Sequence, residues 1–224
     1  MSMIMSHYRE NVEVPHGLTT LDLFRKWARS PEFPSDGHFS FIDGHLYVDL
    51  SVEQLFTHNG VKTAFTGKVS GIVESDENGY YFSDRALVTN EDAGFSTELD
   101  GMYVSYESIH SGRVRLVEGA DEGFVEVEGS PDMTLEIVSS WSVEKDTVIL
   151  RDAYWRAGIK EYWLVDARAE ETQFSILKRG NRGYTATRKL AGGWQYSDVF
   201  ERYFLLLRKV DRLRNPRFEL KVKS

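Results

Sequence analysis

The segment PDMTLEIVSSWSVEKD, residues 131–146, contains two acids in an otherwise apolar run and a lysine shortly after it. If residues 132–138 form a strand, Asp132 and Glu136 share one face, but they lie roughly 13 Å apart at about 3.3 Å per residue. This separation is too long for both acids to hold one metal ion, so Glu136 needs a different partner. The best candidate is Asp100 in STELDGMYVS, which belongs to another apolar run that can lie beside the first.

Two carboxylates that meet at the surface of a sheet form an oxygen-rich site suited to Mg²⁺ or Mn²⁺. Such a metal polarises a phosphoryl oxygen and lowers the pKa of a bound water. Lys145, close behind the strand, can orient that water or stabilise developing negative charge. The structural alternative is that Asp132 only starts a strand, Asp100 only makes a turn with Gly101, and Lys145 lies on the surface.

Helices and strands must position these residues. Apolar spacing predicts helices at residues 21–30, capped by Thr19 or Thr20, at 52–73, and at 143–157 with Gly158 as the stop. The Asp43–Gly44 pair predicts a hairpin within residues 39–50. Further strands are expected at 80–89, 96–105, 113–118, 124–128, 132–139 and 159–167. The strand, helix and strand over residues 132–167 predict a parallel, right-handed crossover.

The remaining segments complete an α/β fold, a mixed β-sheet flanked by helices. Residues 174–190 are predicted to form a hairpin that turns at GNRG, and residues 197–213 a mixture of strand and helix. At 224 residues and 41% apolar content, the chain is expected to form one domain over 1–224, with a flexible basic tail at 209–224.

Charge and cysteine content restrict the partners and the compartment. The net charge is -8, yet residues 71–130 hold 14 acidic and 3 basic residues, and residues 201–224 hold 8 basic and 3 acidic ones. The basic end can contact phosphates, or it can be a solvated surface. The chain has no cysteine, MSMIMSHYREN lacks the features of a signal peptide, and YFLLL is too short to span a bilayer. A cytoplasmic protein without membrane contact is therefore expected.

The order EGSPDMTLEIVS, then KD, then AYWRAGIKEYWLVDAR resembles the putative restriction endonuclease family called Uma-two, a branch of the PD-(D/E)xK nuclease superfamily. The resemblance extends from about residue 18 to about residue 208 through FIDGHLYV, THNGVK and LDGMYVS. It implies a restriction-endonuclease-like core with an added N-terminal hairpin and C-terminal hairpin. It also implies that Asp100 and Glu136 bind Mg²⁺ or Mn²⁺ and that the reaction is hydrolysis of a DNA phosphodiester.

The sequence departs from this family at the catalytic lysine. That lysine should lie two residues beyond Glu136, where this chain has Val138, or in the next helix at the position of Leu150. The catalytic cation is then Lys145 or Arg151, or it is missing. Around the metal, the residues expected in supporting positions are Asp132, His58 and Arg151.

The leading hypothesis is therefore a metal-dependent endonuclease, a hydrolase of DNA. The alternative is a catalytically degenerate module that keeps the nuclease fold for DNA or protein binding. A glycosidase would need two carboxyls that flank a sugar-sized cleft, which nothing else in the sequence calls for. A homodimer is expected because it suits the cutting of two strands. The predicted phosphate contacts are Arg208, Lys209, Arg212 and Arg214.

Overall fold

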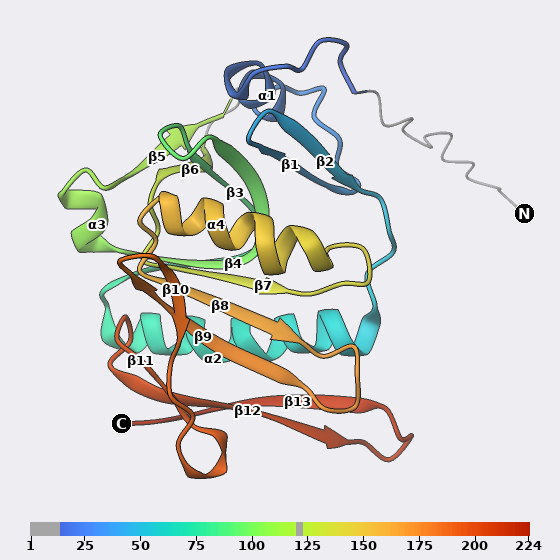
Figure 1. The fold of residues 1–224 in the computed structure, drawn as a ribbon, viewed down its shortest axis with the longest axis vertical. Helices are drawn as coiled ribbons and strands as arrows, with labels where there is room; N and C mark the ends of the chain where they lie inside the picture. Colours follow the sequence, from blue (N-terminus) through green and yellow to red (C-terminus); the bar gives the residue numbers. More distant parts are fainter. Residues whose placement is uncertain (1–13, 120–122) are drawn as a thin grey trace, which may run out of the picture.

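The computed structural model describes residues 14–119 and 123–224, and its main feature is a mixed β-sheet (Figure 1). In these ranges the strands follow the order β10-β9-β8-β7-β4-β3-β6-β5, and the β1–β2 hairpin is attached to β4 through β1. The parallel pairs are β7 with β8 and β3 with β6. The strands are β1 (His38–Ile42), β2 (His45–Asp49), β3 (Gly79–Asn90), β4 (Phe95–Ser105), β5 (Val114–Glu118), β6 (Phe124–Gly129), β7 (Met133–Ile137), β8 (Glu161–Asp166), β9 (Gln173–Gly180) and β10 (Gly183–Ala186).

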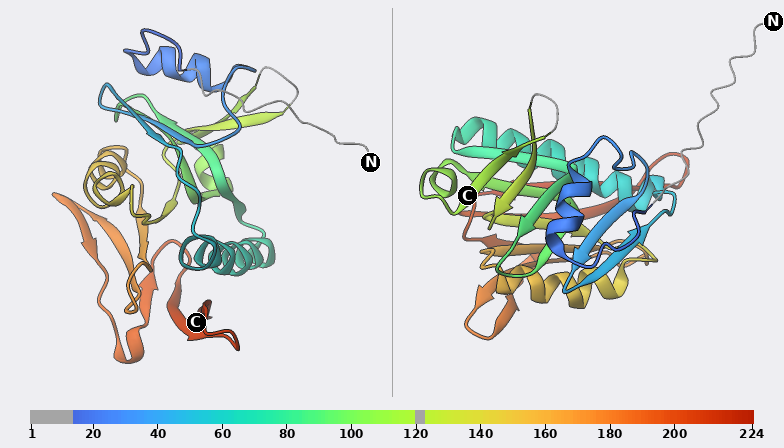
Figure 2. Two further views of the ribbon diagram at one scale, coloured as in Figure 1. Left: turned by 90° about the vertical axis from the view of Figure 1, so that its right-hand side faces the viewer. Right: turned by 90° about the horizontal axis from the view of Figure 1, so that it is seen from above.

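Two long helical segments cover opposite faces of the central strands (Figure 2). One consists of η1 (Leu55–Asn59) and α2 (Gly60–Asp76), and the other of η2 (Lys145–Ile149) and α4 (Leu150–Arg156). Each begins with a π-helical turn, which is wider than an α-helical turn and is frequent at functional sites. The shorter helices are α1 (Leu21–Ala28), α3 (Tyr106–His110) and η3 (Ala191–Gly193).

Local sequence signals explain several of these boundaries. Thr20 Oγ1 accepts a hydrogen bond from Leu23 N at 3.3 Å and caps α1. Asp43 and Gly44, with φ of 50° and 82°, form the two-residue turn between β1 and β2. Gly158, with φ of 79°, follows the end of α4. The predicted α/β class, the N-terminal hairpin and the parallel crossover from β7 through α4 to β8 are confirmed.

The core lies on both faces of the sheet. On the α2 face, Val61, Phe65, Val69 and Val73 recur every four residues and pack with Trp163 and the odd-numbered residues of β7. On the α4 face, Leu150, Ala153 and Tyr154 pack with Tyr162 and Met102. Glu136 alternates with the α2-facing residues of β7, and its side chain therefore points to the α4 face.

β4 carries two different partners along one edge, and this positions the site. β1 pairs with β4 over Phe95–Thr97, whereas β7 pairs with it over Gly101–Tyr103. Glu98 and Asp100 lie between these two ladders, and their side chains accept hydrogen bonds from strand N–H groups. Phe39 N of β1 donates to Glu98 at 2.9 Å, and Ile137 N of β7 donates to Asp100 at 2.8 Å. Between the β1 and β7 ladders, no strand of the described residues pairs with this edge of β4, and the two carboxylates lie in that gap.

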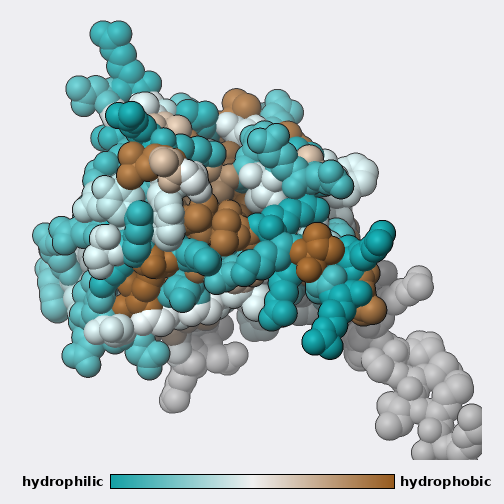
Figure 3. All heavy atoms as spheres, turned by 90° about the horizontal axis from the view of Figure 1, so that it is seen from below, coloured by the Kyte–Doolittle hydropathy of each residue, from teal (hydrophilic) through white to brown (hydrophobic). Residues whose placement is uncertain are grey.

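The C-terminal residues form a second sheet from β11 (Gln195–Ser197), β12 (Arg202–Val210) and β13 (Pro216–Lys223). Two expectations are corrected here, because residues 202–210 are a strand and residues 216–223 of the expected flexible tail pair with it. The physical reason is that Phe218 and Leu220 alternate with charged residues and are buried in the core under α2. The opposite face of this sheet, seen in Figure 3, carries hydrophobic residues among hydrophilic ones.

None of the helices in the described ranges has the length and apolar character of a membrane span. The segment MSMIMSHYREN, considered above for a signal peptide, lies outside the described residues.

Candidate active site

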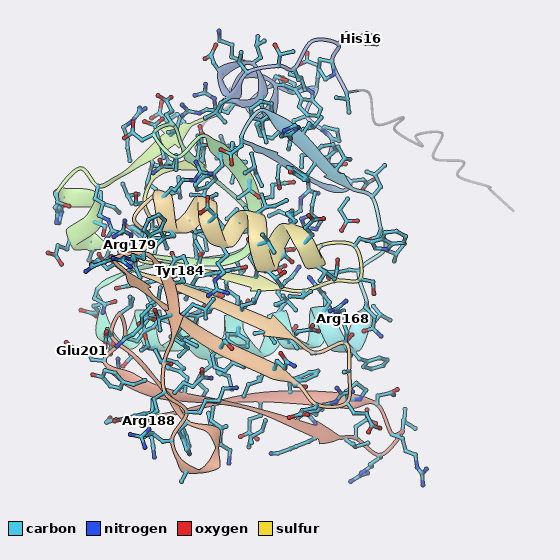
Figure 4. All side chains as sticks on the ribbon, in the orientation of Figure 1. His16, Arg168, Arg179, Tyr184, Arg188 and Glu201 are labelled. Carbon is cyan, nitrogen blue, oxygen red and sulfur yellow. The ribbon has the colours of Figure 1, made fainter. Side chains whose placement is uncertain are left out.

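A cavity of about 400 Å³ opens where β1 and β7 separate along β4. Its walls come from the segment before η1, from η1, from β4, from the end of β7 with the loop that follows, and from η2. Arg168, which also lines it, lies after β8 beside the beginning of α2 (Figure 4). The cavity therefore lies at the end of the molecule where both long helical segments begin.

Asp100 and Glu136 both line this cavity. The antiparallel β4–β7 ladder ends at the pair Gly101–Leu135, and Asp100 and Glu136 are the next two residues beyond that pair. They therefore lie opposite each other on neighbouring strands. The side chain of Asp100 is tied to the β7 backbone through Ile137 N. Glu136 is 3% exposed and accepts a 2.6 Å hydrogen bond from Tyr154 Oη of α4.

A β-bulge in β3 lies directly beside Asp100. The register passes from Ser83–Gly101 to Ala86–Leu99, so Asp84 and Arg85 together stand opposite Asp100. Both bulge residues have left-handed backbone conformations, with φ of 53° and 56°. Asp84 contacts Lys62 at 2.7 Å, and Arg85 contacts Glu98 at 3.0 Å. Strained backbone at a carboxylate cluster is typical of functional sites.

The helical segment of η1 and α2 brings His58 and Lys62 to Asp100, and the residues just before η1 bring Glu53. His58 Nε2 lies 3.6 Å from Asp100 Oδ2, and His58 Nδ1 lies 3.1 Å from Glu53 Oε1. Lys62 Nζ lies 3.2 Å from Asp100 Oδ1 and forms ion pairs with Glu53 and Asp84. Sequence reasoning named His58 but missed Glu53 and Lys62. The i, i+4 spacing of His58 and Lys62 was the available signal.

On the other side of the cavity, η2 contributes Lys145 and Asp146. Lys145 Nζ lies 3.5 Å from Asp146 Oδ1, and Ser142 Oγ donates a hydrogen bond to Asp146 Oδ2. Asp146 is fully buried, and its Oδ1 atom has no hydrogen-bond partner among the described residues. Asp146 was also missed, although it directly follows the predicted lysine.

The electrostatics of the cavity favour a bound cation. Burial raises the pKa of Glu136 well above its ordinary range, the charges of Asp146 and Asp100 raise it further, and Lys145 opposes the rise. Burial likewise raises the pKa of Asp146 to about 6. Burial lowers the pKa of Lys145, but the charges of Asp146, Glu136 and Asp100 outweigh it and raise the pKa. Added positive charge would therefore stabilise the carboxylates in their ionised form.

The donor atoms of the cavity fit a divalent metal. Ligand atoms of Glu53, His58 and Asp100 all lie within 4.8 Å of one another. Carboxylate oxygens suit Mg²⁺ and Mn²⁺, and the imidazole nitrogen makes transition metals such as Mn²⁺ the better match. Glu136 stands outside this group of three but lines the same cavity.

Two residues expected near the metal lie elsewhere, which corrects the sequence analysis. Asp132 belongs to a second pocket, where it accepts hydrogen bonds from Ser105 N and Ser108 Oγ and forms ion pairs with Arg113 and Lys160. Asp132 directly precedes β7 whereas Glu136 is the last residue but one of that strand, so nearly the whole length of the strand separates them.

Arg151 also points away from the cavity. Its guanidinium donates to the main-chain oxygen of Tyr184 in β10 at 2.9 Å. Figure 4 shows Tyr184 across the strands from Arg168. Of the two cations considered as replacements for the missing lysine, only Lys145 lines the cavity.

Comparisons with known proteins agree with this fold. The model of the Uma2 family, described as "Putative restriction endonuclease", matches residues 21–204. The chain is also similar to a solved structure described as a putative nuclease belonging to DUF820 from Anabaena variabilis. The two are 15% identical, the match covers 81% of this chain and 90% of that chain, and the TM-score is 0.58, which shows a shared fold. No curated protein sequence gives a significant match.

Proposed function

Because the chain belongs to the Uma2 family of putative restriction endonucleases, we propose that it is a metal-dependent endonuclease that hydrolyses DNA phosphodiester bonds. The observation that carries this proposal is the meeting of Asp100, Glu136 and Lys145 in one cavity. Carboxylates and a lysine are the groups that phosphodiester hydrolysis needs around a divalent ion. Fold alone would leave the activity open, since one fold hosts many functions.

Asp100 and Glu136 would hold Mg²⁺ or Mn²⁺, with Glu53 and His58 beside Asp100 as further ligands. A bound ion of this kind polarises a phosphoryl oxygen and lowers the pKa of water. Lys145 would stabilise the negative charge that develops on the phosphate, as the lysine of the E-x-K motif would from position 138. Tyr154 orients Glu136 through its hydrogen bond, and Lys62 neutralises the carboxylates around Asp100.

The second candidate function is a nuclease-fold module without catalysis. It is favoured by Val138, a buried apolar residue at the position of the missing lysine. It is also favoured by Lys62, whose ammonium already contacts Glu53 and Asp100 where a metal would bind. Such a module would bind DNA or protein and leave the phosphodiester intact.

DNA as the partner is supported by the end of the C-terminal hairpin. The turn between β12 and β13 lies at the same end of the molecule as the beginning of α2 (Figure 1), and β13 contacts η1. Arg212 and Arg214 are exposed in this turn. Arg208 instead binds the carbonyl oxygens of Ala167, Ala169 and Glu170, and Lys209 pairs with Glu219. Of the four side chains predicted to contact phosphates, Arg208 and Lys209 thus already bind other protein groups.

The homodimer and the cytoplasmic location stay predictions. The molar mass of the protein in solution, measured by light scattering, tests the homodimer. A tagged copy followed by cell fractionation tests the location.

The experiment that separates the two functions is cleavage of plasmid and single-stranded DNA with Mg²⁺ or Mn²⁺. Wild type should cut, whereas Glu136→Gln and Lys145→Met should lose at least about 100-fold in rate. Arg151→Met is the matched control and should cut like wild type, because its guanidinium contacts Tyr184 and not the cavity.

Calorimetric titration with Mn²⁺ completes this design. Binding that disappears in an Asp100→Ala, Glu136→Ala double variant supports the metal site. Binding without cleavage of any DNA would favour the non-catalytic module, and cleavage retained by Glu136→Gln would overturn the site assignment.

A further inference from the structure

Trp141 is 79% exposed and lies in the wall of the candidate active site. It belongs to the loop between β7 and η2, five residues after Glu136 and four before Lys145. A tryptophan buries a large apolar surface when it is in contact, so exposure to water on this scale is unfavourable unless a ligand covers the ring. Its position beside the carboxylates suggests which ligand that is.

The loop holds Trp141 in place through reciprocal serine contacts. Ser139 Oγ accepts hydrogen bonds from Trp141 N at 3.2 Å and from Ser142 N at 3.0 Å. Ser142 Oγ in turn accepts from Ser139 N at 2.9 Å and donates to Asp146. The exposed ring is therefore attached to the same hydrogen-bond network as a buried acid of the cavity. Its exposure is a property of an ordered turn.

We propose that Trp141 is a stacking platform for an unpaired nucleobase, and that the site acts on single-stranded nucleic acid. This inference rests on the proposed nuclease function and adds the class of its substrate. Every nucleobase has an apolar face that an aromatic ring can cover, and such stacking is a common mode of single-strand binding. Lys145 and Arg168 line the same cavity, where each pairs with an acid near it in the chain, Asp146 and Asp166 respectively. Both bring positive charge to the side of the cavity where the adjoining phosphate would lie.

Duplex DNA fits this arrangement less well. Within a duplex both faces of each base are covered by neighbouring bases, and only the base edges are open in the grooves. A ring at the rim of a cavity reaches a base face only after the base has left the stack, at a cost of a few kcal/mol. A single strand has no such cost. The platform should therefore favour single strands, flaps or loops over intact duplex.

A second copy of the chain is the competing occupant, because Leu50 and Val52 beside Trp141 are 59% and 96% exposed. These apolar residues alternate with charged ones, since Asp49, Glu53 and Arg168 line the same wall. The cores of stable homodimer interfaces are depleted in charged residues. The mixture of one aromatic ring with cations and acids matches a nucleotide better than a second protein surface.

The test is binding without cleavage, in the Glu136→Gln background with Mn²⁺. A fluorescently labelled oligo(dT) strand and a blunt duplex of the same length are titrated against Trp141, Trp141→Phe and Trp141→Ala proteins. Trp141→Ala should weaken single-strand binding by about 5- to 150-fold and Trp141→Phe by much less. Duplex binding should change little. Val148→Ala, an exposed apolar residue of η2 outside the cavity wall, is the matched control and should bind like the parent.

The inference is overturned if the Trp141→Ala protein binds the single strand as tightly as the parent does. It is also overturned if the substitution weakens duplex binding as much as single-strand binding. A fall in molar mass of the Trp141→Ala protein in light scattering also overturns it, because the ring would then cover a second copy. These readouts do not depend on hydrolysis. Selective loss of single-strand binding in a protein that cuts no DNA would reject the nuclease function and keep the platform. Cleavage of single-stranded DNA that is unaffected by Trp141→Ala would keep the nuclease function and reject the platform.

Discussion

The hydroxyl of Tyr154 donates a 2.6 Å hydrogen bond to Oε1 of Glu136, so a fully buried tyrosine of α4 fixes the carboxylate at the end of β7. The contact joins the helix to the strand of the same crossover. It orients one oxygen of Glu136 while the carboxylate still lines the cavity. Hydrogen bonds of this kind to a metal ligand set its orientation and basicity.

Tyr154→Phe removes this hydrogen bond while keeping the packing of the ring. We expect Mn²⁺ affinity or DNA cleavage to fall by about 10- to 100-fold, because the carboxylate loses its fixed orientation. Calorimetric titration and a cleavage assay measure the two effects. Tyr184→Phe is the matched control, since it removes a buried hydroxyl that donates to Ile159 O away from the cavity. Equal effects of the two substitutions would contradict a specific role for Tyr154.

Lys62 occupies the centre of an acidic group, and its removal should change the response to metal. Lys62→Met leaves Glu53, Asp84 and Asp100 without their shared ammonium, so the metal-free protein should lose about 3 kcal/mol of stability. Mn²⁺ should raise its melting temperature by more than it raises that of wild type. Lys68→Met, an exposed position of the same helix, should respond like wild type. Thermal denaturation with and without Mn²⁺ measures this, and an unchanged metal response would separate Lys62 from the metal site.

Asp132 should stabilise the fold without affecting the metal. Asp132→Asn removes charge-assisted contacts to Arg113 and Lys160, and we expect a loss of about 2 kcal/mol in the free energy of unfolding. Urea denaturation measures the loss. Mn²⁺ titration should give the wild-type affinity, because Asp132 lines a different pocket. A weaker metal affinity would restore the supporting role first expected for this residue.

The same substitution has a defined pH dependence. Burial alone would raise the pKa of Asp132, but hydrogen bonds from Lys160, Ser105 N and Ser108 outweigh it and hold the pKa below its ordinary value of 3.8. A folded-state pKa below the unfolded value means that the stabilisation is complete above 3.8 and is lost as the pH falls through the folded pKa. The stability difference between wild type and Asp132→Asn should therefore stay constant near neutral pH and shrink below about pH 4.

Arg212 and Arg214 should account for part of the salt dependence of DNA binding. Replacing both with alanine should weaken DNA binding. It should also reduce the slope of the logarithm of the binding constant against the logarithm of the salt concentration by about 1.4 to 1.8, which corresponds to the loss of two phosphate contacts. Arg188→Ala is the control, because Arg188 is exposed but lies near β11, far from the β12–β13 turn (Figures 1 and 4). An unchanged slope in the double variant would remove the turn from the DNA-binding surface.

Local signals in the sequence predicted much of the fold. The Asp43–Gly44 turn and the Thr20 cap depend on residues within a few positions of one another, and the crossover around α4 follows from successive strand, helix and strand patterns. All three were found. The strand β13 was missed although Phe218, Leu220 and Val222 alternate with charged residues. Its positive charge suggested a solvated tail, whereas burial under α2 decides its structure.

Of the residues expected at the site, Asp100, Glu136, Lys145 and His58 line one cavity, whereas Glu53, Lys62 and Asp146 were not expected there. Asp100 and Glu136 meet because two apolar strands pair, which the sequence pattern suggests. Lys62 comes to Asp100 from a helical segment that begins with a π turn, and Glu53 comes from the residues just before that turn. Nothing in the hydrophobic spacing indicates the π turn. The opposite error was Asp132, whose acidic character suggested the site although its place at the start of β7 excludes it.

The bulge at Asp84 and Arg85 affects how relatives of this chain should be aligned. It inserts one extra residue into β3, opposite Asp100, so the side chains on its two sides follow different alternation. A relative with a regular strand at this place would need a gap of one position, and an ungapped alignment would assign inward residues to the outward face. Covariation between β3 and its neighbours, counted without that gap, would link the wrong pairs of positions. The bulge therefore marks where a search for the partners of Asp100 among relatives should shift its numbering.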